Sequence, residues 1–448
     1  MSRALCLAFA LTFAAAPRAR AFCGFFVGKA DADLFNKSSQ VALVRDGNRT
    51  VLTMSNDYKG PLTEFALVVP VPSVLTRDQI HVGDRKLLER LDAYSSPRLV
   101  EYTDPDPCSV IARRSYWAKS APIALEAVTG GMLERAKAKG VTIEATYTVG
   151  EYDILLLSAK QSEGLEAWLR ESGYRIPAHA SRALAPYIRQ DMKFFVAKVN
   201  LKEQKAAGFQ ELRPIQIAYE SPRFMLPIRL GMANADGTQD LIVYAITRNG
   251  RVESSNYQTV RIPSDADVPE FVQQDFGSFY KSTFARAWES HDRRAILTEY
   301  SWNMAWCDPC AAPPLDEGEL RELGVFWVDQ NPVPPMPGGR MMRGGGMPVM
   351  LTRLHVRYDA QHFPEDLMFQ ETGDQQNFQG RYVLRHAFKG EMNCKAAAEY
   401  QTSLRERRLR EAETLASLTG WSADTIQTRM GPDSVPAKAE PWWKRIWK

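Results

Sequence analysis

Short apolar segments separated by turn residues recur through the chain, and this pattern constrains its fold more than any other feature. Segments 40–44 and 50–54 flank the turn residues Asp46-Gly47-Asn48, an arrangement that predicts a β-hairpin. Between residues 213 and 263 the sequence is almost entirely strand-like, and its regular spacing predicts an antiparallel meander. The four strands expected there cover residues 215–219, 224–230, 240–248 and 257–262.

Helical patterns are interspersed with these strands. The predicted fold class is therefore α+β, with antiparallel or mixed β-sheets and helices packed on them. Leu165, Trp168 and Leu169 share one helical face, and Ser158 with Gln161 is expected to form the capping box of that helix.

Two longer helices are expected in the second half of the chain. Pro269 opens the first, whose aromatic side chains recur at helical spacing, a pattern that favours packing on a sheet over a ligand groove. The second is a long C-terminal helix over residues 394–419 that should end at Gly420. Glu406 and Arg410 are spaced to pair along it.

The N-terminus is typical of a secretory signal peptide. Arg3 is followed by the apolar run 4–16 and by Ala19-Arg20-Ala21, a small-x-small cleavage site. The apolar run is too short to cross a bilayer. We therefore expect a soluble periplasmic or secreted protein after signal peptide cleavage near Ala21.

The chain has 448 residues, 45% of them hydrophobic, which is enough for more than one core. We expect a signal peptide (1–21), an N-terminal α+β domain (22–202), a C-terminal domain of β-meander and helices (203–431) and a tail (432–448). Without the three arginines of the signal peptide, the mature chain has 53 basic and 53 acidic residues. This balance argues against a nucleic-acid partner.

Six cysteines are present, and one of them, Cys6, lies in the signal peptide. An exported protein is expected to use the others in disulfides. We expect Cys23 to pair with Cys108, because these two residues flank one N-terminal unit. Cys394 can pair with Cys307 or Cys310, or the latter two can pair with each other, and the odd number leaves one thiol free or bonded to another chain.

Trp306-Cys307-Asp308-Pro309-Cys310 is the most chemically specific local pattern in the chain, and it is similar to the redox motif of thioredoxin-like proteins. That chemistry needs a buried strand before the motif and a helix after it. Pro313 and Pro314 follow too soon for a long helix. A structural disulfide is therefore favoured over redox catalysis by Cys307 and Cys310.

Two possible metal sites carry weaker signals. His355 and His362 could share a metal if the chain folds back, but their spacing matches no zinc pattern. Methionines around the loop 332–348 offer thioether ligands for Cu(I), although Arg340 and Arg343 disfavour a second cation. These methionines are Met336, Met341, Met342, Met347 and Met350.

The C-terminal tail mixes tryptophans with basic residues. Trp442, Trp443 and Trp447 occur together with three cations, a composition that suits weak contact with an anionic membrane surface.

Several stretches, taken together, form a specific pattern. They are FCGFFV (22–27), VPVP (69–72), GEYD (150–153), WL and GY (168–169 and 173–174), LPIRLGM and DG (226–232 and 236–237), WCDPC (306–310) and HFPED (362–366). With them, from about Phe22 to Trp421, the chain resembles a bacterial exported family known as a domain of unknown function, DUF2330. The resemblance implies export and supplies no catalytic residue.

The sequence contains no HExxH, G-x-S-x-G, Walker or G-x-G-x-x-G motif. It therefore predicts a non-catalytic protein, without a cofactor, that binds or scaffolds a ligand or protein of the cell envelope. The alternatives are a thiol–disulfide oxidoreductase using Cys307 and Cys310, and a copper-binding protein using the methionine-rich loop.

Overall fold

The computed structural model describes residues 25–27, 35–36, 39–55, 58–59, 66–109, 141–171, 180–200, 202–203, 212–233, 237–306, 308, 311–328 and 347–431. Helices and mixed and antiparallel sheets occur together in these ranges, so the predicted α+β class is confirmed. No helix in the described ranges is long and apolar enough to cross a membrane.

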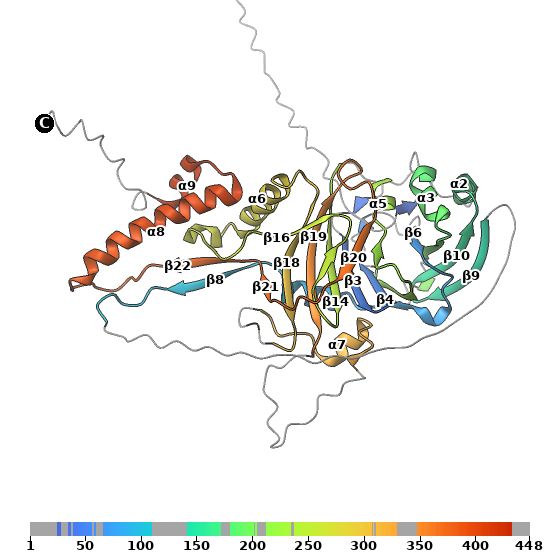
Figure 1. The fold of residues 1–448 in the computed structure, drawn as a ribbon, viewed down its shortest axis with the longest axis horizontal. Helices are drawn as coiled ribbons and strands as arrows, with labels where there is room; N and C mark the ends of the chain where they lie inside the picture. The colour runs from blue at the N-terminus through green and yellow to red at the C-terminus, as the bar shows by residue number, and fades with distance from the viewer. Residues whose placement is uncertain are drawn as a thin grey trace, which may run out of the picture.

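The widest β-sheet, here called the large sheet, lies in the middle of the molecule (Figure 1). Its strand order is β16-β18-β19-β14-β3-β4-β12-β7, and β21 pairs with β18. The pairs β14/β3 and β16/β18 are parallel and the others are antiparallel. The strands are β3 (Ser39–Asp46), β4 (Arg49–Ser55), β7 (Ile80–Val82), β12 (Ile215–Glu220), β14 (Gln239–Thr247), β16 (Gln258–Arg261), β18 (Ala295–Asn303), β19 (Met350–Tyr358) and β21 (Phe378–Gln379).

A second sheet, here called the small sheet, packs on one face of the large sheet. Its order is β1-β6-β11-β10-β9, and every pair is antiparallel. The strands are β1 (Phe25–Val27), β6 (Ala66–Val71), β9 (Val141–Val149), β10 (Tyr152–Ala159) and β11 (Lys193–Val199). Side chains of a strand point alternately to its two faces. The odd-numbered apolar residues of β14, such as Leu241 and Val243, therefore point toward the small sheet, where they share a core with Phe195 of β11.

Helices cover the outer faces of both sheets, giving four layers. On the large sheet, even-numbered residues of β14 such as Ile242 and Ile246 pack with α1 (Arg85–Ser95) and α7 (Glu317–Glu322). On the small sheet, Phe194 and Val196 pack with Leu165 and Leu184 of α2 (Ser162–Glu171) and α3 (Ala180–Arg189). Both faces of β14 are therefore buried, which explains why this strand is nearly continuously apolar.

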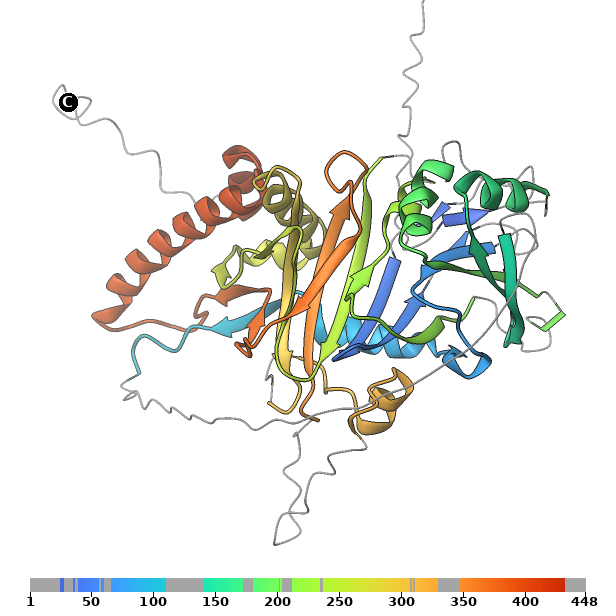
Figure 2. The same ribbon diagram turned by 45° about the vertical axis from the view of Figure 1, so that its right-hand side comes forward.

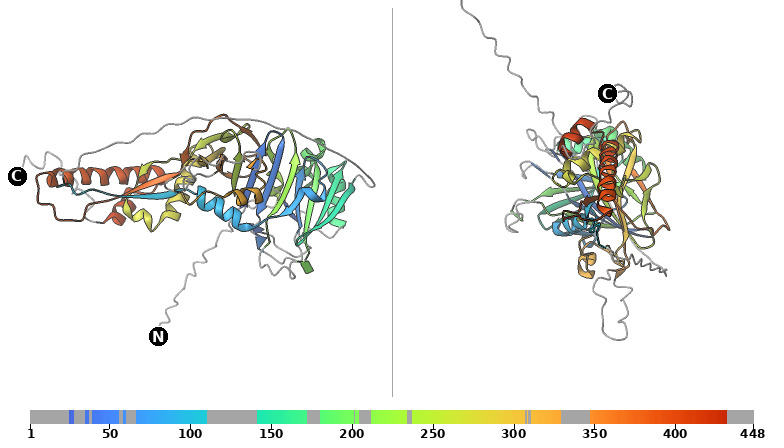
Figure 3. Two further views of the ribbon diagram at one scale, coloured as in Figure 1. Left: turned by 90° about the horizontal axis from the view of Figure 1, so that it is seen from below. Right: turned by 90° about the vertical axis from the view of Figure 1, so that its left-hand side faces the viewer.

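Beyond the four layers, the chain forms an arm (Figures 2 and 3). The arm contains a third, three-stranded sheet in the order β17-β22-β8, whose strands pair in parallel. Helices α6, α8 and α9 cover it. The elements are β8 (Arg98–Thr103), β17 (Ala266–Asp267), the 3-10 turn η3 (Glu270–Gln273), α6 (Phe276–Glu289), β22 (Arg381–His386), α8 (Ala396–Thr419) and α9 (Ala423–Met430). Distant parts of the chain therefore build the arm together.

Short elements complete the description of the fold. They are β2 (Phe35–Asn36), β5 (Tyr58–Lys59), η2 (Arg77–Gln79), β13 (Met225–Leu226), α5 (Arg229–Ala233), β15 (Val252–Ser254) and β20 (Leu367–Glu371). The large sheet contains strands from both sides of residue 202, and the domain boundary expected there stays a prediction.

Several local predictions are confirmed. The hairpin β3–β4 forms with Gly47 at φ 56°, where the absence of a side chain relieves the strain of a left-handed turn. The aromatic face of α6 is buried at Phe279, Phe284 and Trp288. Helix α8 ends at Gly420 in the left-handed conformation.

The predicted meander is wrong. β12 lies between β4 and β7, and β14 lies between β3 and β19, so the strands after residue 213 pair mainly with strands from elsewhere in the chain. The strand expected over residues 224–230 is limited to β13, since the chain turns at Pro227 into α5. Pairing of distant strands leaves no local signal in the sequence.

Two helix starts also differ from the prediction. Ser158 lies inside β10, so it cannot form a capping box with Gln161, and α2 begins at Ser162. Pro269 opens the short 3-10 turn η3, and α6 starts only at Phe276, after a break at Gln274 and Asp275.

The disulfide connectivity differs from the expected one. Cys108 is bonded to Cys394, 286 residues away, with Cα atoms 5.7 Å apart. Both proposed pairings, Cys23 with Cys108 and Cys394 with Cys307 or Cys310, are therefore wrong. The physical reason is the parallel pairing of β8 with β22, which brings the loop after β8 next to the start of α8.

Candidate functional site

Most residues singled out from the sequence lie outside the described ranges. These are Cys23, Cys307, Cys310, Met336, Met341, Met342, Trp442, Trp443 and Trp447. A Cys307–Cys310 bridge, copper binding by the methionines and membrane contact by the tail therefore stay predictions. The described residues contain two other polar sites, one on β19 and one in the arm.

His355 of β19 lies beneath α6 with its side chain 13% exposed, and it contacts two carboxylates. Its Nδ1 lies 2.7 Å from Glu299 Oε1 and its Nε2 lies 3.2 Å from Asp240 Oδ1. The ring of Phe284 stacks on the imidazole, with ring centroids 3.8 Å apart. Burial alone would lower the pKa of His355, but the two carboxylates outweigh it and raise this pKa. The two carboxylates therefore favour the imidazolium form of His355, which can donate from both nitrogens.

Glu299 reaches His355 because of a β-bulge in β18. The register with β19 shifts between Thr298 and Tyr300, which leaves Glu299 as the extra residue. Its carboxylate is 1% exposed, accepts a hydrogen bond from Tyr280 and lies 2.5 Å from the Nε of Arg353. Burial favours the neutral acid, yet His355 and Arg353 outweigh it and lower the pKa of Glu299 to about 2.

Two arginines of β19 complete the group. Arg353 donates to Asp92 of α1 at 2.7 Å, and Arg357 binds Asp240 through two nitrogens at 2.8 and 3.0 Å. We call this group the β19 charge cluster. It consists of Asp92, Asp240, Glu299, Arg353, His355 and Arg357.

Three carboxylates and three cations balance one another in this cluster. Burial of Asp240 is outweighed by His355 and Arg357, which hold its pKa well below the usual range. While it is protonated, His355 has no lone pair available for a general base or a metal ligand. The cluster is therefore suited to fixing α1 and α6 on the large sheet.

The stability supplied by this cluster should depend on pH in both directions. Because the pKa of His355 is raised on folding, its contribution is complete below about pH 6.5 and is lost as the pH rises through the folded-state value. Because the pKa of Glu299 is lowered to about 2, its contribution is complete above about pH 4.5 and is lost on acidification. Urea unfolding of the wild type and of His355→Gln should therefore differ most between about pH 4.5 and about pH 6.5. A difference that stays constant from about pH 5 to about pH 10 would contradict this coupling.

His362 does not join His355. Its Nδ1 lies 2.8 Å from Asp359 Oδ2, and its backbone N–H donates to the same carboxylate at 2.9 Å. The nearby Asp366 is also engaged, because it accepts from the Tyr187 hydroxyl at 2.6 Å. Among the described residues, no three His, Cys, Asp or Glu side chains gather as they would around a metal ion.

The second polar site is a cleft in the arm, here called the α8–α9 cleft. It has a volume of about 250 Å³ and lies between η3, β22, α8 and α9. Its walls are Pro269, Glu270, Phe271, Arg385, Leu404, Arg407, Arg408, Glu411, Arg429 and Met430. The cleft combines charged and apolar groups, so it offers both kinds of contact to a small ligand.

A buried carboxylate lies in the wall of this cleft. Glu411 of α8 is 5% exposed and lies 3.3 Å from the Nε of Arg407. Within the described residues its Oε1 accepts no hydrogen bond, and the Nε–H of Arg407 donates none. Burial raises the pKa of Glu411 to about 7, although Arg407 opposes this. Glu411 can therefore change its charge near neutral pH.

Contacts with β8 and the loop that follows it hold α8 in place. Besides the Cys108–Cys394 disulfide, Asp104 accepts from both terminal nitrogens of Arg407 at 2.9 and 2.8 Å. Tyr400 donates to the same carboxylate at 2.7 Å. One wall of the cleft is thus fixed covalently and by charge.

Both sites have signals in the sequence that match no known motif. Arg353, His355 and Arg357 alternate with apolar residues, which predicts a charged face on a strand. Glu411 falls on the same helical face as Leu404 and Leu415, where a carboxylate is out of place. Glu299 had no such signal, because the sequence does not predict the β-bulge that places its side chain next to His355.

The fold and sites define a layered α+β protein with a disulfide-linked arm. The chain belongs to the bacterial family DUF2330, described as an uncharacterized protein conserved in bacteria, whose family model matches residues 17–370. This match confirms the resemblance seen in the sequence, but it ends before β22, α8 and α9, whereas the resemblance was expected to reach about Trp421. No curated protein and no solved structure matches the chain.

Proposed function

We propose that this chain is an exported, non-catalytic protein of the cell envelope that binds a ligand in the α8–α9 cleft. The disulfide between Cys108 and Cys394 is the observation that carries the proposal. Disulfides persist in oxidising compartments and are rare in the cytoplasm. Here the bond fixes the start of the helix that forms one wall of the cleft.

The state of His355 supports a non-catalytic role. A catalytic histidine needs a nitrogen that can accept a proton, whereas both nitrogens of His355 face carboxylates. The cluster lies under α6 and α1, so its chemistry serves the packing of these helices. Binding is then assigned to the cleft, which has space and polar groups for a ligand.

The proposal predicts where the chain is found and how its sulfurs are bonded. Expressed at full length in a Gram-negative bacterium, it should appear in the periplasmic or secreted fraction with a mature N-terminus near Phe22. Non-reducing digestion and mass spectrometry should recover a peptide that joins Cys108 to Cys394. Cytoplasmic protein that retains Met1 and has every thiol open to alkylation would refute the proposal. Catalysis of insulin reduction by the mature protein would refute its non-catalytic part.

A further inference from the structure

Guanidinium groups from three elements converge on the α8–α9 cleft. Arg385 comes from β22, Arg407 and Arg408 from α8, and Arg429 from α9. Glu270 and Glu411 also line the cleft, so its walls carry an excess of positive charge. The planar fork of arginine matches the geometry of carboxylate and phosphate groups.

Neighbouring carboxylates orient Arg385 and Arg407 without using all of the N–H donors of these two side chains. Asp104 takes the two terminal nitrogens of Arg407 and leaves its Nε–H without an acceptor among the described residues. Asp267 accepts from the Nε of Arg385 at 2.9 Å. Since a guanidinium carries five N–H donors, both side chains keep donors for a further anion.

Glu411 and Arg407 present a second, independent indication of a ligand. The two side chains lie 3.3 Å apart in a buried position, yet neither the Oε1 nor the Nε–H makes a hydrogen bond within the described part of the chain. Buried polar atoms nearly always have a partner. A protonated Glu411 and the Nε–H of Arg407 would together offer two donors to one acceptor group.

The rest of the cleft sets the size and character of the ligand. Phe271, Leu404 and Met430 supply apolar walls beside the arginines. A volume of about 250 Å³ is smaller than the pockets that hold drug-sized molecules. These dimensions fit a small molecule with one charged group and an apolar remainder.

We propose that the α8–α9 cleft binds a small organic anion, consisting of an apolar group that bears one carboxylate or phosphate, and that Glu411 takes up a proton when this anion binds. The inference deepens the proposed function and rests on it, because it assigns a ligand class to the same cleft. The arginines hold the anionic group, the apolar walls hold the remainder, and protonation of Glu411 removes a buried negative charge that would repel the ligand.

Calorimetric titration of the mature chain with benzoate tests this inference, because the charge of benzoate does not change near neutral pH. We expect saturable binding whose dissociation constant rises up to about tenfold per pH unit above about pH 7. Phenyl phosphate should also bind, whereas benzyl alcohol, which lacks the charge, and inorganic phosphate, which lacks the apolar group, should bind at least about tenfold more weakly.

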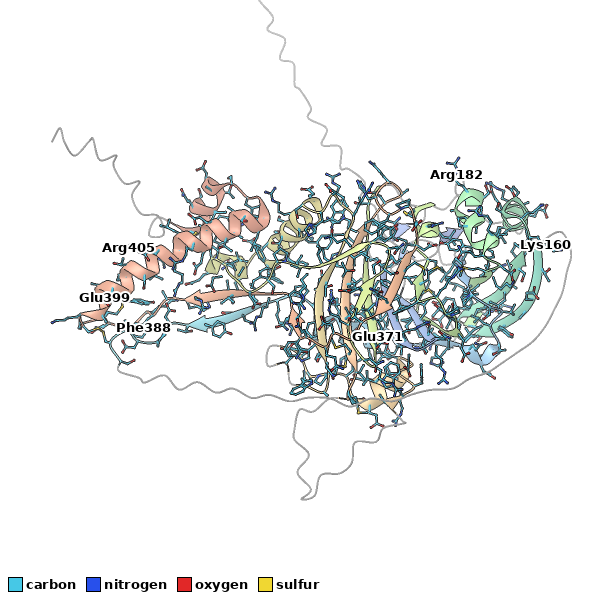
Figure 4. The ribbon with its side chains drawn as sticks, in the orientation of Figure 1. Lys160, Arg182, Glu371, Phe388, Glu399 and Arg405 are labelled. Atoms are coloured by element: carbon cyan, nitrogen blue, oxygen red, sulfur yellow. A yellow bond between two sulfur atoms is a disulfide. The ribbon has the colours of Figure 1, made fainter. Side chains whose placement is uncertain are left out.

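Three variants separate the parts of the cleft. Glu411→Gln is neutral at every pH, so it should bind benzoate with an affinity that no longer changes between about pH 6 and about pH 9. Arg408→Gln, in the cleft wall, should weaken binding about tenfold or more. Arg405→Gln is the matched control, because Arg405 is exposed on the same helix outside the cleft (Figure 4), and it should change the affinity by about twofold or less. Thermal unfolding checks that each variant is folded.

Equal losses in Arg405→Gln and Arg408→Gln would overturn the inference, since they would indicate diffuse electrostatic attraction. The inference would also be overturned if the benzoate affinity of Glu411→Gln still changed with pH. Absence of benzoate binding to the wild type at about 10 mM ligand would overturn it as well. A chain that is exported with its Cys108–Cys394 bond but binds none of these anions contradicts only this inference. A reduced cytoplasmic chain contradicts the proposed function whatever the calorimeter records.

Discussion

Replacing Cys108 and Cys394 together by serine is expected to lower the free energy of unfolding by about 2–5 kcal/mol. The bond closes a loop of 286 residues, so its removal returns a large amount of conformational freedom to the unfolded chain. The folded arm should persist in the variant, because Asp104 still binds Arg407 and Tyr400. Urea unfolding of both proteins under oxidising conditions measures the difference.

Reductant provides the control for this prediction. Once the disulfide is reduced, the wild type and the double serine variant should unfold at nearly the same urea concentration. A gap that persists in reductant would show that the serines disturb the folded arm itself. Unfolding of both proteins at the same urea concentration without reductant would contradict the stabilising role of the bond.

Replacing Glu299 by alanine is expected to lower the free energy of unfolding by about 3–5 kcal/mol. Glu299 is almost completely buried and faces Arg353 and the imidazolium of His355, so its loss leaves two buried cations with too little compensating charge. Glu299→Gln keeps the shape and removes the charge, and it should therefore destabilise the protein as well. The measurement is urea unfolding near pH 6, where the cluster contributes most.

An exposed ion pair supplies the matched control. Glu220 lies 3.7 Å from Arg49 and its side chain is 52% exposed, so Glu220→Ala should cost about 1 kcal/mol or less. If Glu299→Ala and Glu220→Ala proved equally mild, the β19 charge cluster would not be an important source of stability.

The sequence predicted elements whose cause is local. The hairpin at Gly47 and the end of α8 at Gly420 depend on backbone conformations that glycine adopts without strain. The buried face of α6 follows from helical spacing, as expected. Each of these features is decided by residues within a few positions of one another.

Pairing between distant segments could not be predicted in this way. β14 lies between β3 and β19, which are far apart in the sequence. The residues of β14 do not indicate which strands pair with it. The same limit applies to Cys108, whose partner is set by the pairing of β8 with β22. Proximity in the sequence therefore led to the wrong prediction that Cys23 is the disulfide partner of Cys108.

The candidate sites were predicted only in part. His355 was singled out, but its carboxylates come from β14 and β18 and convert a possible metal ligand into an imidazolium. The α8–α9 cleft depends on packing between α8, α9 and β22, which the sequence does not reveal. The sequence signal for this cleft is the carboxylate of Glu411 on an apolar helical face.

The long separation of the bonded cysteines has a consequence for maturation. If the chain is exported as proposed, Cys23 and Cys108 would reach the oxidising compartment well before Cys394, which follows Cys108 by 286 residues. An oxidase acting on thiols in order of arrival would first join Cys23 to Cys108, a link that the folded protein excludes. Correct assembly then requires delayed oxidation or reshuffling by a disulfide isomerase, so the yield of folded protein should fall in cells that lack such an enzyme.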